Sequence, residues 1–455
     1  MRTSLIIGAL VLVCALLLGA AALGQLTRAH TDMTITETTL TGDPAAAEGL
    51  HVTLTTQREN QLFWTTDYDA GTAPRPRTEF TYFYSRQHED YVPDDRFSLQ
   101  LGNLNVGFGG GFSEEDLLLM DEENKWFGPR EGYMLKPLME LAPKVPAGQT
   151  MTETVRLRDY YEAYRIGWYG PEPVDWETLC ELLYVPVPED LLLTVSVTKD
   201  SYGNADMMET YPAEGQDQLG LWGEAFPVGQ DLYLYLARED VGREDLTRLP
   251  LGYGLYRIPL NEEGMADMAK AENVYPLDPA SESFRQVARS ADGRSLYLQI
   301  RDEQGMRLVI WNLQTGAAEQ AFPLEGEQTF DIWMDEELLV LQDYNEETAR
   351  TRITALRKED GQYALWLRTD LYPLTPEGGW YGDPSLAFDG TRLAIAAYHD
   401  TWTTCSHRLQ VYTQSGLQYA GDYAHSNDAL ENGMWTDWPN SLQITWRASA
   451  SHGSP

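Results

Sequence analysis

The sequence contains few of the residues that most often carry chemistry, with 3 cysteines and 7 histidines among 455 residues. Three cysteines are too few for a disulfide-stapled scaffold. We expect Cys180 and Cys405 to be buried free thiols, and a disulfide between them is the alternative. The sequence also lacks a G-x-S-x-G nucleophile elbow and an H-E-x-x-H metalloprotease helix. These absences leave no motif that names a reaction.

Positive charge is scarce as well, because 33 Lys and Arg residues stand against 70 Asp and Glu residues, for a formal net charge of −37. A surface this acidic repels the phosphates of nucleic acids and the headgroups of anionic lipids. We therefore expect no nucleic-acid partner and a domain that stands clear of the membrane surface. Apolar residues make up 43% of the chain and aromatic residues 11%, which is typical of a folded domain rather than a disordered one.

Long apolar runs are missing except at the N-terminus, where Ser4–Gly24 carries no charged and no aromatic residue. A helix of about 20 apolar residues matches the roughly 30 Å hydrocarbon core of a bilayer. The run predicts a transmembrane signal-anchor over residues 1–28, in a single-pass protein of the cell membrane whose C-terminal domain lies outside the cytoplasm. A signal peptide cleaved near Ala22 or Gly24 and a lipoprotein modified at Cys14 are the alternatives.

Beyond this run, most of the chain alternates polar residues with β-branched or aromatic ones, which is the period-2 pattern of strands. Leu50–Thr56, Gln61–Thr66 and Thr78–Ser85 are three such segments. Only short helical patterns interrupt the series, as at Trp176–Leu183. The sequence therefore predicts an all-β protein, with a stalk over residues 29–47 between the anchor and the folded domain.

The second half of the chain repeats one pattern, in which an Asp-Gly turn leads into a strand and a partner strand follows. It occurs at Ser290–Leu298 with Arg307–Leu313, and again at Phe388–Ile395 with Arg408–Tyr412. Four short strands in each repeat of about 40–60 residues are typical of propeller blades. We therefore expect a β-propeller-like domain of about seven or eight irregular blades over residues 48–447.

One segment fits a series of blades poorly, because Pro129–Val187 combines prolines with helical patterns. The alternative architecture is an N-terminal β-sandwich-like domain followed by a partial propeller, with a boundary near residues 200–220. In either arrangement, we expect residues 448–455 to form a disordered tail.

Residues 290–324 resemble a WD-repeat blade, with Ile310-Trp311-Asn312 where that family often has an aromatic residue and an acid. Because Asn312 replaces the usual Asp and no Gly-His pair precedes it, the resemblance implies a generic propeller. The chain as a whole resembles a group of uncharacterised, N-terminally membrane-anchored proteins with a divergent propeller, and this resemblance implies no activity. It rests on four segments: Gly42-Asp43-Pro44, Gln61-Leu62-Phe63-Trp64, Thr154-Val155-Arg156-Leu157-Arg158-Asp159-Tyr160-Tyr161 and Gly252-Tyr253-Gly254-Leu255-Tyr256-Arg257.

Residue types that bind metals gather at one place in the sequence: His399, Asp400, Cys405 and His407. Their spacing, H-x5-C-x-H around the thiol, matches no standard zinc site. Asp67–Gly71 begins like an EF-hand loop, but Thr78 stands where that loop needs a bidentate Glu. We therefore expect no metal site and no cofactor. The first segment is interpreted as a surface loop and the second as a hairpin turn.

Aromatic residues recur in the Gly-, Pro- and Asp-rich segments between predicted strands, and five of them are candidates for a binding face: Trp380, Tyr381, Trp402, Trp435 and Trp438. Exposed aromatic residues on loops of a rigid scaffold often bind a protein or a glycan. The alternative is that they fill the seams between blades. We expect a membrane-anchored extracytoplasmic module that binds or senses a ligand, or serves as a scaffold. The alternative function is an exported hydrolase with a carboxylate or calcium-assisted site in the propeller channel.

Overall fold

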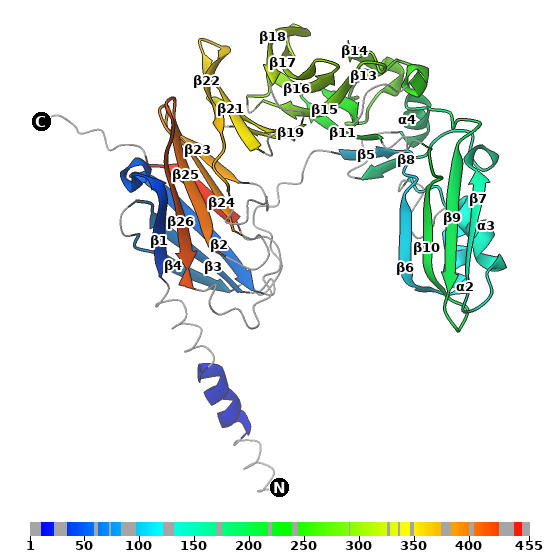
Figure 1. Cartoon of the computed structure of the whole chain (residues 1–455), viewed down its shortest axis with the longest axis horizontal. Coiled ribbons are helices and arrows are strands. Elements are labelled where there is room, and N and C mark those ends of the chain that lie inside the picture. The colour runs from blue at the N-terminus through cyan, green and yellow to red at the C-terminus, as the bar shows by residue number, and fades with distance from the viewer. Residues whose placement is uncertain are drawn as a thin grey trace, which may run out of the picture. The chain divides into compact units, whose positions relative to one another are not determined.

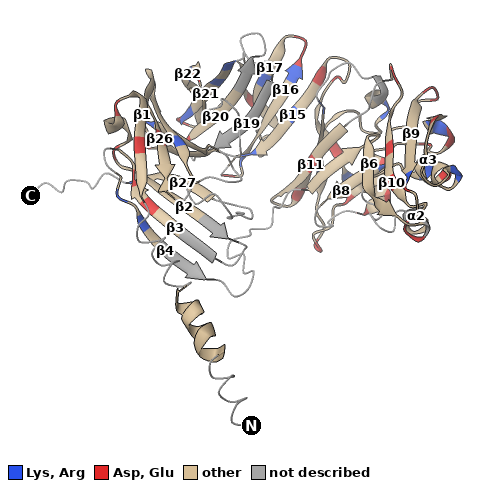
Figure 2. Ribbon diagram, turned by 60° about the horizontal axis from the view of Figure 1, so that its bottom comes forward, with Lys and Arg blue, Asp and Glu red and all other residues tan. Residues whose placement is uncertain are grey.

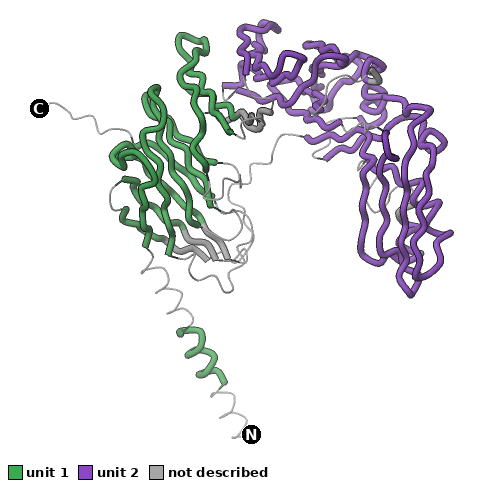
Figure 3. The backbone as a smooth tube through the Cα atoms, in the orientation of Figure 1, with its two compact units in different colours: residues 1–90, 326–455 green, residues 91–325 purple. Residues whose placement is uncertain are grey.

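The computed structural model consists mainly of antiparallel strands, with a few short helices (Figure 1). The chain forms two compact units, unit 1 from residues 1–90 and 326–455 and unit 2 from residues 91–325 (Figure 3). The structure describes residues 11–21, 34–58, 62–71, 74–82, 97–121, 132–169, 175–216, 221–238, 244–290, 292–324, 328–334, 337–345, 350–374, 384–399, 405–426 and 441–447.

The N-terminal apolar run is described over residues 11–21, which are helical. A spanning helix needs about 20 apolar residues. Within the part of the chain that the structure describes, no helix is long and apolar enough to cross a membrane. The predicted localisation, a single-pass cell-membrane protein attached through residues 4–24, is therefore wrong on this finding.

Unit 1 contains three antiparallel sheets, which we name by their strands. The β19–β22 sheet is a meander in chain order: β19 (Gln328–Met334), β20 (Leu338–Asn345), β21 (Arg350–Glu359) and β22 (Gln362–Asp370). The β23–β26 sheet carries β1 at its edge: β23 (Ser385–Phe388), β24 (Leu393–Tyr398), β25 (His407–Thr413), β26 (Gly416–His425) and β1 (Ile35–Gly42). The β2–β4 sheet carries β27 at its edge: β27 (Ser441–Trp446), β2 (Leu50–Arg58), β3 (Leu62–Asp69) and β4 (Arg77–Tyr82).

The β23–β24 hairpin shows how the repeated Asp-Gly pattern forms a turn. The Asp389 carboxylate accepts a hydrogen bond of 2.7 Å from the backbone N–H of Arg392. Gly390 adopts a φ of 91°, a left-handed conformation that costs glycine little. The turn at Asp292 and Gly293, where the glycine has a φ of 65°, repeats the arrangement. Both turns that the repeat predicts are therefore formed.

The β23–β26 sheet is buried on both faces, because successive side chains of a strand point to opposite sides. One set of β24 side chains packs in a hydrophobic cluster with β20 and β21: Leu393, Ile395 and Ala397. The alternate set packs in a second cluster with β2: Ala394, Ala396 and Tyr398. The sheet is thus the middle layer of three antiparallel sheets, which pack face to face as neighbouring blades do.

The first two strands and the last strand of the described chain are built into these sheets. β2 pairs with β27, with Leu50 opposite Trp446, and β1 pairs with β26. The Arg392 guanidinium lies 3.9 Å from the centre of the Trp446 ring and donates a 2.9 Å hydrogen bond to the carbonyl of Ala46. The described sheets do not close into a ring. The structure therefore shows a mostly β protein with blade-like sheets, and the ring of seven or eight blades is not formed by them.

Unit 2 contains a ten-stranded sheet with two parts. Four strands form a meander in chain order: β15 (Glu282–Arg289), β16 (Ser295–Asp302), β17 (Gly305–Asn312) and β18 (Ala317–Leu324). A parallel bridge between Ala237 and Phe284 joins this meander to the other six strands. These are β5 (Phe97–Leu101), β8 (Ile166–Tyr169), β11 (Leu221–Val228), β12 (Asp231–Ala237), β13 (Gly254–Pro259) and β14 (Glu272–Pro276).

A second sheet of unit 2 is inserted between β5 and β11, which pair directly with each other. Its strands are β6 (Val106–Phe112), β7 (Thr150–Arg156), β9 (Leu192–Lys199) and β10 (Ala205–Pro212). The helices of this region are α2 (Glu114–Asp121), α3 (Lys136–Leu141) and α4 (Trp176–Leu182). Leu138 and Leu141 of α3 are buried in the same cluster as Val195 and Val197 of β9. Within the segment Pro129–Val187, which fits a blade poorly, α3 and β7 belong to this α+β insertion, whereas β8 pairs with β5 in the ten-stranded sheet. The insertion breaks the expected series of blades.

Domain boundaries at residues 28, 47 and 447, with a division near 200–220, stay predictions. Residues 35–47 of the predicted stalk form β1 and a 3-10 turn, η1 (Pro44–Ala47). None of Cys14, Cys180 and Cys405 forms a disulfide bond among the described residues, and Cys405 is buried while Cys180 is half-buried.

Candidate ligand-binding pocket

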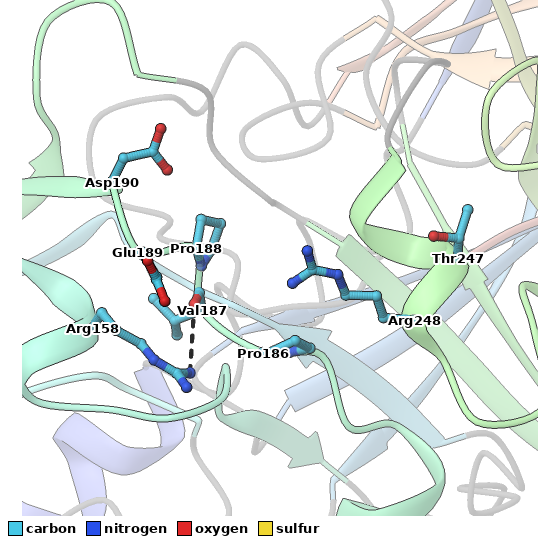
Figure 4. A pocket seen from close by; sticks show the side chains of 8 residues that line it. All are labelled: Arg158, Pro186, Val187, Pro188, Glu189, Asp190, Thr247 and Arg248. Carbon is cyan, nitrogen blue, oxygen red and sulfur yellow. Dashed lines mark hydrogen bonds between the residues drawn. The ribbon is translucent and has the colours of Figure 1, made fainter.

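Unit 2 contains a pocket of about 550 Å³ where the α+β insertion meets a short turn of the larger sheet (Figure 4). This volume falls within the range of about 300–1,000 Å³ that is usual for small-molecule sites. Its lining is half charged and half proline, valine and threonine: Arg158, Pro186, Val187, Pro188, Glu189, Asp190, Thr247 and Arg248.

One wall of the pocket is the loop 185–191, which connects α4 to β9. Backbone hydrogen bonds fasten this loop on both sides of the pocket: Tyr164 N–H to Val185 O (2.9 Å), Val187 N–H to Glu162 O (3.1 Å) and Leu157 N–H to Leu191 O (3.0 Å). Pro186 and Pro188 further restrict the backbone between these bonds, because a proline ring fixes φ. The wall is therefore held in place without a ligand.

Arg158 lies behind this wall on a short 3-10 turn, η3 (Leu157–Asp159). Its Nη1 donates to the carbonyl of Glu162 and, at 3.5 Å, to the carbonyl of Val187. A guanidinium has five N–H donors, so the other nitrogens of Arg158 keep donors that these two carbonyls do not use. Arg158 both fastens the loop and contributes positive charge to the pocket.

Arg248 lies opposite, at the last position of a second 3-10 turn, η4 (Glu244–Arg248). Figure 4 shows its guanidinium reaching toward the 186–190 loop. Among the described residues, Arg248 has no hydrogen-bond or ion-pair partner. Its donors therefore face the pocket without a protein acceptor.

Two adjacent carboxylates, Glu189 and Asp190, complete the charged lining. Neither has a hydrogen-bond or ion-pair partner within the described ranges. Two cations and two anions thus line one pocket without neutralising each other. Elsewhere, acidic and basic residues are interspersed along the ribbons (Figure 2), and several of them form pairs, such as Arg307 with Glu282.

The five aromatic residues of the predicted binding face lie outside the described residues: Trp380, Tyr381, Trp402, Trp435 and Trp438. Their roles stay predictions. A sixth aromatic from a similar loop-like segment, Trp168, lies in β8, where it is buried and stacks on Phe97 with ring centres 5.2 Å apart.

The two histidines of the segment with metal-binding residue types lie on opposite faces of the β23–β26 sheet. His407 faces the β2–β4 sheet, where its Nε2 contacts the Tyr68 hydroxyl. His399 lies on the other face, where its Nε2 is 3.2 Å from Asp422 Oδ1. Asp400 lies outside the described residues. The two histidines therefore cannot bind one ion together, and the described residues hold no group of three or more His, Cys, Asp or Glu side chains arranged for a metal.

The EF-hand-like start at Asp67–Gly71 overlaps the end of strand β3 instead of forming a hairpin turn. Asp69 Oδ1 lies 2.7 Å from Arg447 Nη2 and 3.1 Å from His51 Nδ1. Asp67 Oδ1 accepts a 2.6 Å hydrogen bond from the Thr53 hydroxyl. Both carboxylates are thus occupied by partners on neighbouring strands.

Carboxyl groups with a shifted pKa bear on the hydrolase alternative. Within the described ranges, each such group has its pKa held below the ordinary value, because hydrogen-bond donors outweigh the opposing effect of burial: Asp116, Glu140, Asp200, Asp389 and Asp422. A general acid in glycoside hydrolysis needs the opposite shift. These five groups are stabilised in the wrong ionisation state for that role.

Sequence reasoning missed the pocket, because its residues come from three separate segments around positions 158, 186–190 and 247–248. The run Pro186-Val187-Pro188-Glu189-Asp190 carries a signal, since two prolines beside two acids predict a rigid, polar loop. Nothing in the sequence indicates that Arg248 lies opposite that loop.

Comparison with known proteins gives no family for the chain: no protein-family model and no curated protein matches it. The solved structures that it resembles include the β-propeller domain of Myceliophteria thermophila Cps50 (Swd1), with 11% identity, a TM-score of 0.26 and coverage of 51% of this chain and 82% of that one. TolB from Acinetobacter baumannii shows 10% identity and a TM-score of 0.24, with coverage of 89% and 84%.

A chain of the Mitotic Checkpoint Complex shows 12% identity and a TM-score of 0.23. The match covers 44% of this chain and 46% of that one, so this chain spans less than half the length of that match. Likenesses at these TM-scores carry no argument about this protein. Its description as blade-like rests on its own sheets and their packing.

Proposed function

We propose that this protein is a binding module and that the Arg158–Arg248 pocket of unit 2 is its ligand site. The observation that carries the proposal is Arg248, a guanidinium that faces a fastened wall and has no protein partner among the described residues. The Arg248 side chain is exposed to solvent, so its donors can exchange water for a ligand without breaking a protein hydrogen bond.

The wall supports this function because it needs no rearrangement on binding. Its backbone hydrogen bonds and prolines are already in place, so the ordering cost that reduces affinity in a mobile loop is small here. A ligand group that accepts from Arg248 gains charge-assisted hydrogen bonds, which are stronger than neutral ones. The pocket therefore combines a rigid frame with available charged donors.

The five loop aromatics are a further proposal for the same binding function, with a protein or a glycan as the ligand. The pair Trp435 and Trp438 provides the test. If they face solvent, Trp435→Ala with Trp438→Ala leaves the unfolding midpoint unchanged and weakens capture of the ligand. A large loss of stability would place them in the core and contradict a role in binding.

A ligand screen on the full chain tests the pocket proposal. A library of small anions, cations, neutral compounds and zwitterions is assayed by thermal shift, and each hit is repeated on Arg248→Gln. The matched control is Arg294→Gln, which removes the same charge from an exposed turn of unit 2 outside the pocket. We expect hits that shift the wild type and Arg294→Gln equally and shift Arg248→Gln less. No hit that depends on Arg248 would contradict the proposal.

A further inference from the structure

We propose that the ligand of the Arg158–Arg248 pocket is a zwitterion with the chemistry of a short peptide or free amino acid, an inference that rests on the proposed function. Its carboxylate would lie against Arg248 and its ammonium group against Glu189 and Asp190. The juxtaposition behind this assignment is four charged side chains, two of each sign, around one pocket of about 550 Å³.

The charges are available to a ligand because they do not satisfy each other. Arg248, Glu189 and Asp190 make no hydrogen bond or ion pair with the described residues. Arg158 is engaged through Nη1 with two backbone carbonyls and not with a carboxylate. Opposite charges held apart on the walls of one cavity match a ligand that carries both signs at separate positions.

Ligands of a single sign fit this lining poorly. An anion that contacts Arg248 places its charge near Glu189 and Asp190, and a cation that contacts these acids approaches the arginines. The protein as a whole, at a net charge of −37, also repels anions at long range. A zwitterion has no net charge, so it avoids that repulsion and can interact with lining charges of both signs.

The apolar part of the lining matches the rest of such a ligand. Pro186 and Pro188 are half-buried on either side of Val187 (Figure 4), and the two prolines offer carbon surface to a side chain or a Cα atom. The volume accommodates a molecule of a few residues. The pocket thus combines charged groups of both signs with apolar surface, as a short peptide does.

Dialanine is the probe for this inference, with two analogues that each lack one charge. N-acetyl-dialanine lacks the ammonium group, and dialanine amide lacks the carboxylate. Binding to the full chain is measured by isothermal titration calorimetry near pH 7, supported by ligand-observed NMR for weak binding. We expect dialanine to bind at least about tenfold more tightly than either analogue, which is the effect of losing one charged hydrogen bond.

Variants assign each end of the probe to its side of the pocket. Arg248→Gln is chosen because Arg248 fastens no part of the wall. In this variant, the preference for dialanine over its amide should disappear, while the preference over N-acetyl-dialanine remains. In Glu189→Gln with Asp190→Asn, the preference for dialanine over N-acetyl-dialanine should disappear, while the preference over dialanine amide remains. The matched control is Glu262→Gln with Glu263→Gln, an exposed pair of adjacent acids outside the pocket.

The outcomes separate this inference from the function on which it rests. Equal binding of dialanine and N-acetyl-dialanine, both weakened in Arg248→Gln, would overturn the zwitterion and leave an anion-binding pocket. No binding of dialanine, together with an unrelated library compound that depends on Arg248, would also overturn it. No binding of any compound through Arg248 would contradict both proposals.

Discussion

Arg408 in unit 1 and Arg248 in unit 2 show two opposite uses of one side chain. Arg408 lies on β25, where only 6% of its side chain is exposed. Its Nε and Nη2 donate to the two Asp422 oxygens at 2.6 and 2.9 Å, and its Nη1 donates to the carbonyl of Pro373 at 2.8 Å. Among the residues that the structure describes, Arg248 has no such partner. Arg408 thus stabilises the fold, whereas Arg248 is available to a ligand.

The comparison extends to the polar residues around each arginine. On the same strand as Arg408, Gln410 donates to the carbonyl of Tyr372 at 2.9 Å, and the Tyr412 hydroxyl donates to Gln410 Oε1 at 2.6 Å. These bonds tie the segment that follows β22 to the middle sheet of unit 1. The lesson is that pairing, more than burial or charge alone, distinguishes structural charges from candidate ligand contacts in this chain.

The largest expected effect comes from removing the buried cation. Arg408→Met should destabilise the protein by about 3 kcal/mol, because it leaves the Asp422 carboxylate without its bidentate partner. Urea unfolding followed by tryptophan fluorescence measures the change. The matched control is Arg350→Met, since Arg350 is 69% exposed and pairs with Asp370 on the surface, where a pair contributes about 0.5 kcal/mol. If the two variants lost the same free energy of unfolding, the distinction between the buried, paired Arg408 and an exposed arginine would be contradicted.

Asp422→Asn should cost about 2 kcal/mol near neutral pH, the contribution of hydrogen bonds to a charged group. Burial opposes ionisation of Asp422, but the hydrogen bonds and charge of Arg408, with His399, outweigh it and hold the pKa of Asp422 below 3.8. Because this pKa is lower in the folded state than in the unfolded state, the stabilisation is complete above about pH 4 and is lost as the pH falls through the folded value. The gap between wild type and variant should therefore be smaller below pH 4 than at pH 5. A gap that widens below pH 4 would contradict this assignment.

Tyr412→Phe should cost about 1 kcal/mol, since it removes a hydroxyl that donates to Gln410 and accepts a 3.1 Å bond from the backbone N–H of Tyr372. Burial raises the pKa of Tyr412, so the hydroxyl stays protonated across the usual range of pH. Thermal unfolding measures the loss. An unchanged midpoint would show that this tie does not contribute to the stability of unit 1.

Arg248→Gln should have the smallest effect on stability, within about 0.5 kcal/mol of the wild type. No described residue depends on Arg248 for a hydrogen bond. Urea unfolding under the conditions used for Arg408→Met gives a direct comparison. A loss of several kcal/mol would identify Arg248 as a structural residue and remove the main support for the pocket.

The sequence predicts those parts of the fold that depend on local patterns. The turns at Asp292-Gly293 and Asp389-Gly390 follow from side-chain and backbone chemistry within a few residues, and both are formed. The continuous apolar run of β24 is similarly typical of a strand that is buried on both faces. These features are readable because each is determined by neighbours in the chain.

Long-range pairings are not readable in the same way. The sequence of Pro129–Val187 indicates only that this segment fits a blade poorly. The structure shows that β5 pairs directly with β11, which makes the region between these strands an insertion. The N-terminal apolar run has the composition of an anchor, yet no helix among the described residues is long and apolar enough to cross a membrane. The pocket depends on three distant segments and on the absence of partners for Arg248, and neither property has a sequence signature.

The most direct test of the central claim measures Arg248→Gln and Arg408→Met in the same two assays, urea unfolding and calorimetric titration with dialanine. We predict that Arg248→Gln keeps its unfolding free energy and loses at least about tenfold in affinity. Arg408→Met should lose about 3 kcal/mol of stability and keep its affinity under conditions in which it is folded. If Arg248→Gln binds dialanine as the wild type does, or if Arg408→Met binds more weakly while folded, the separation between structural and ligand-binding charges is contradicted.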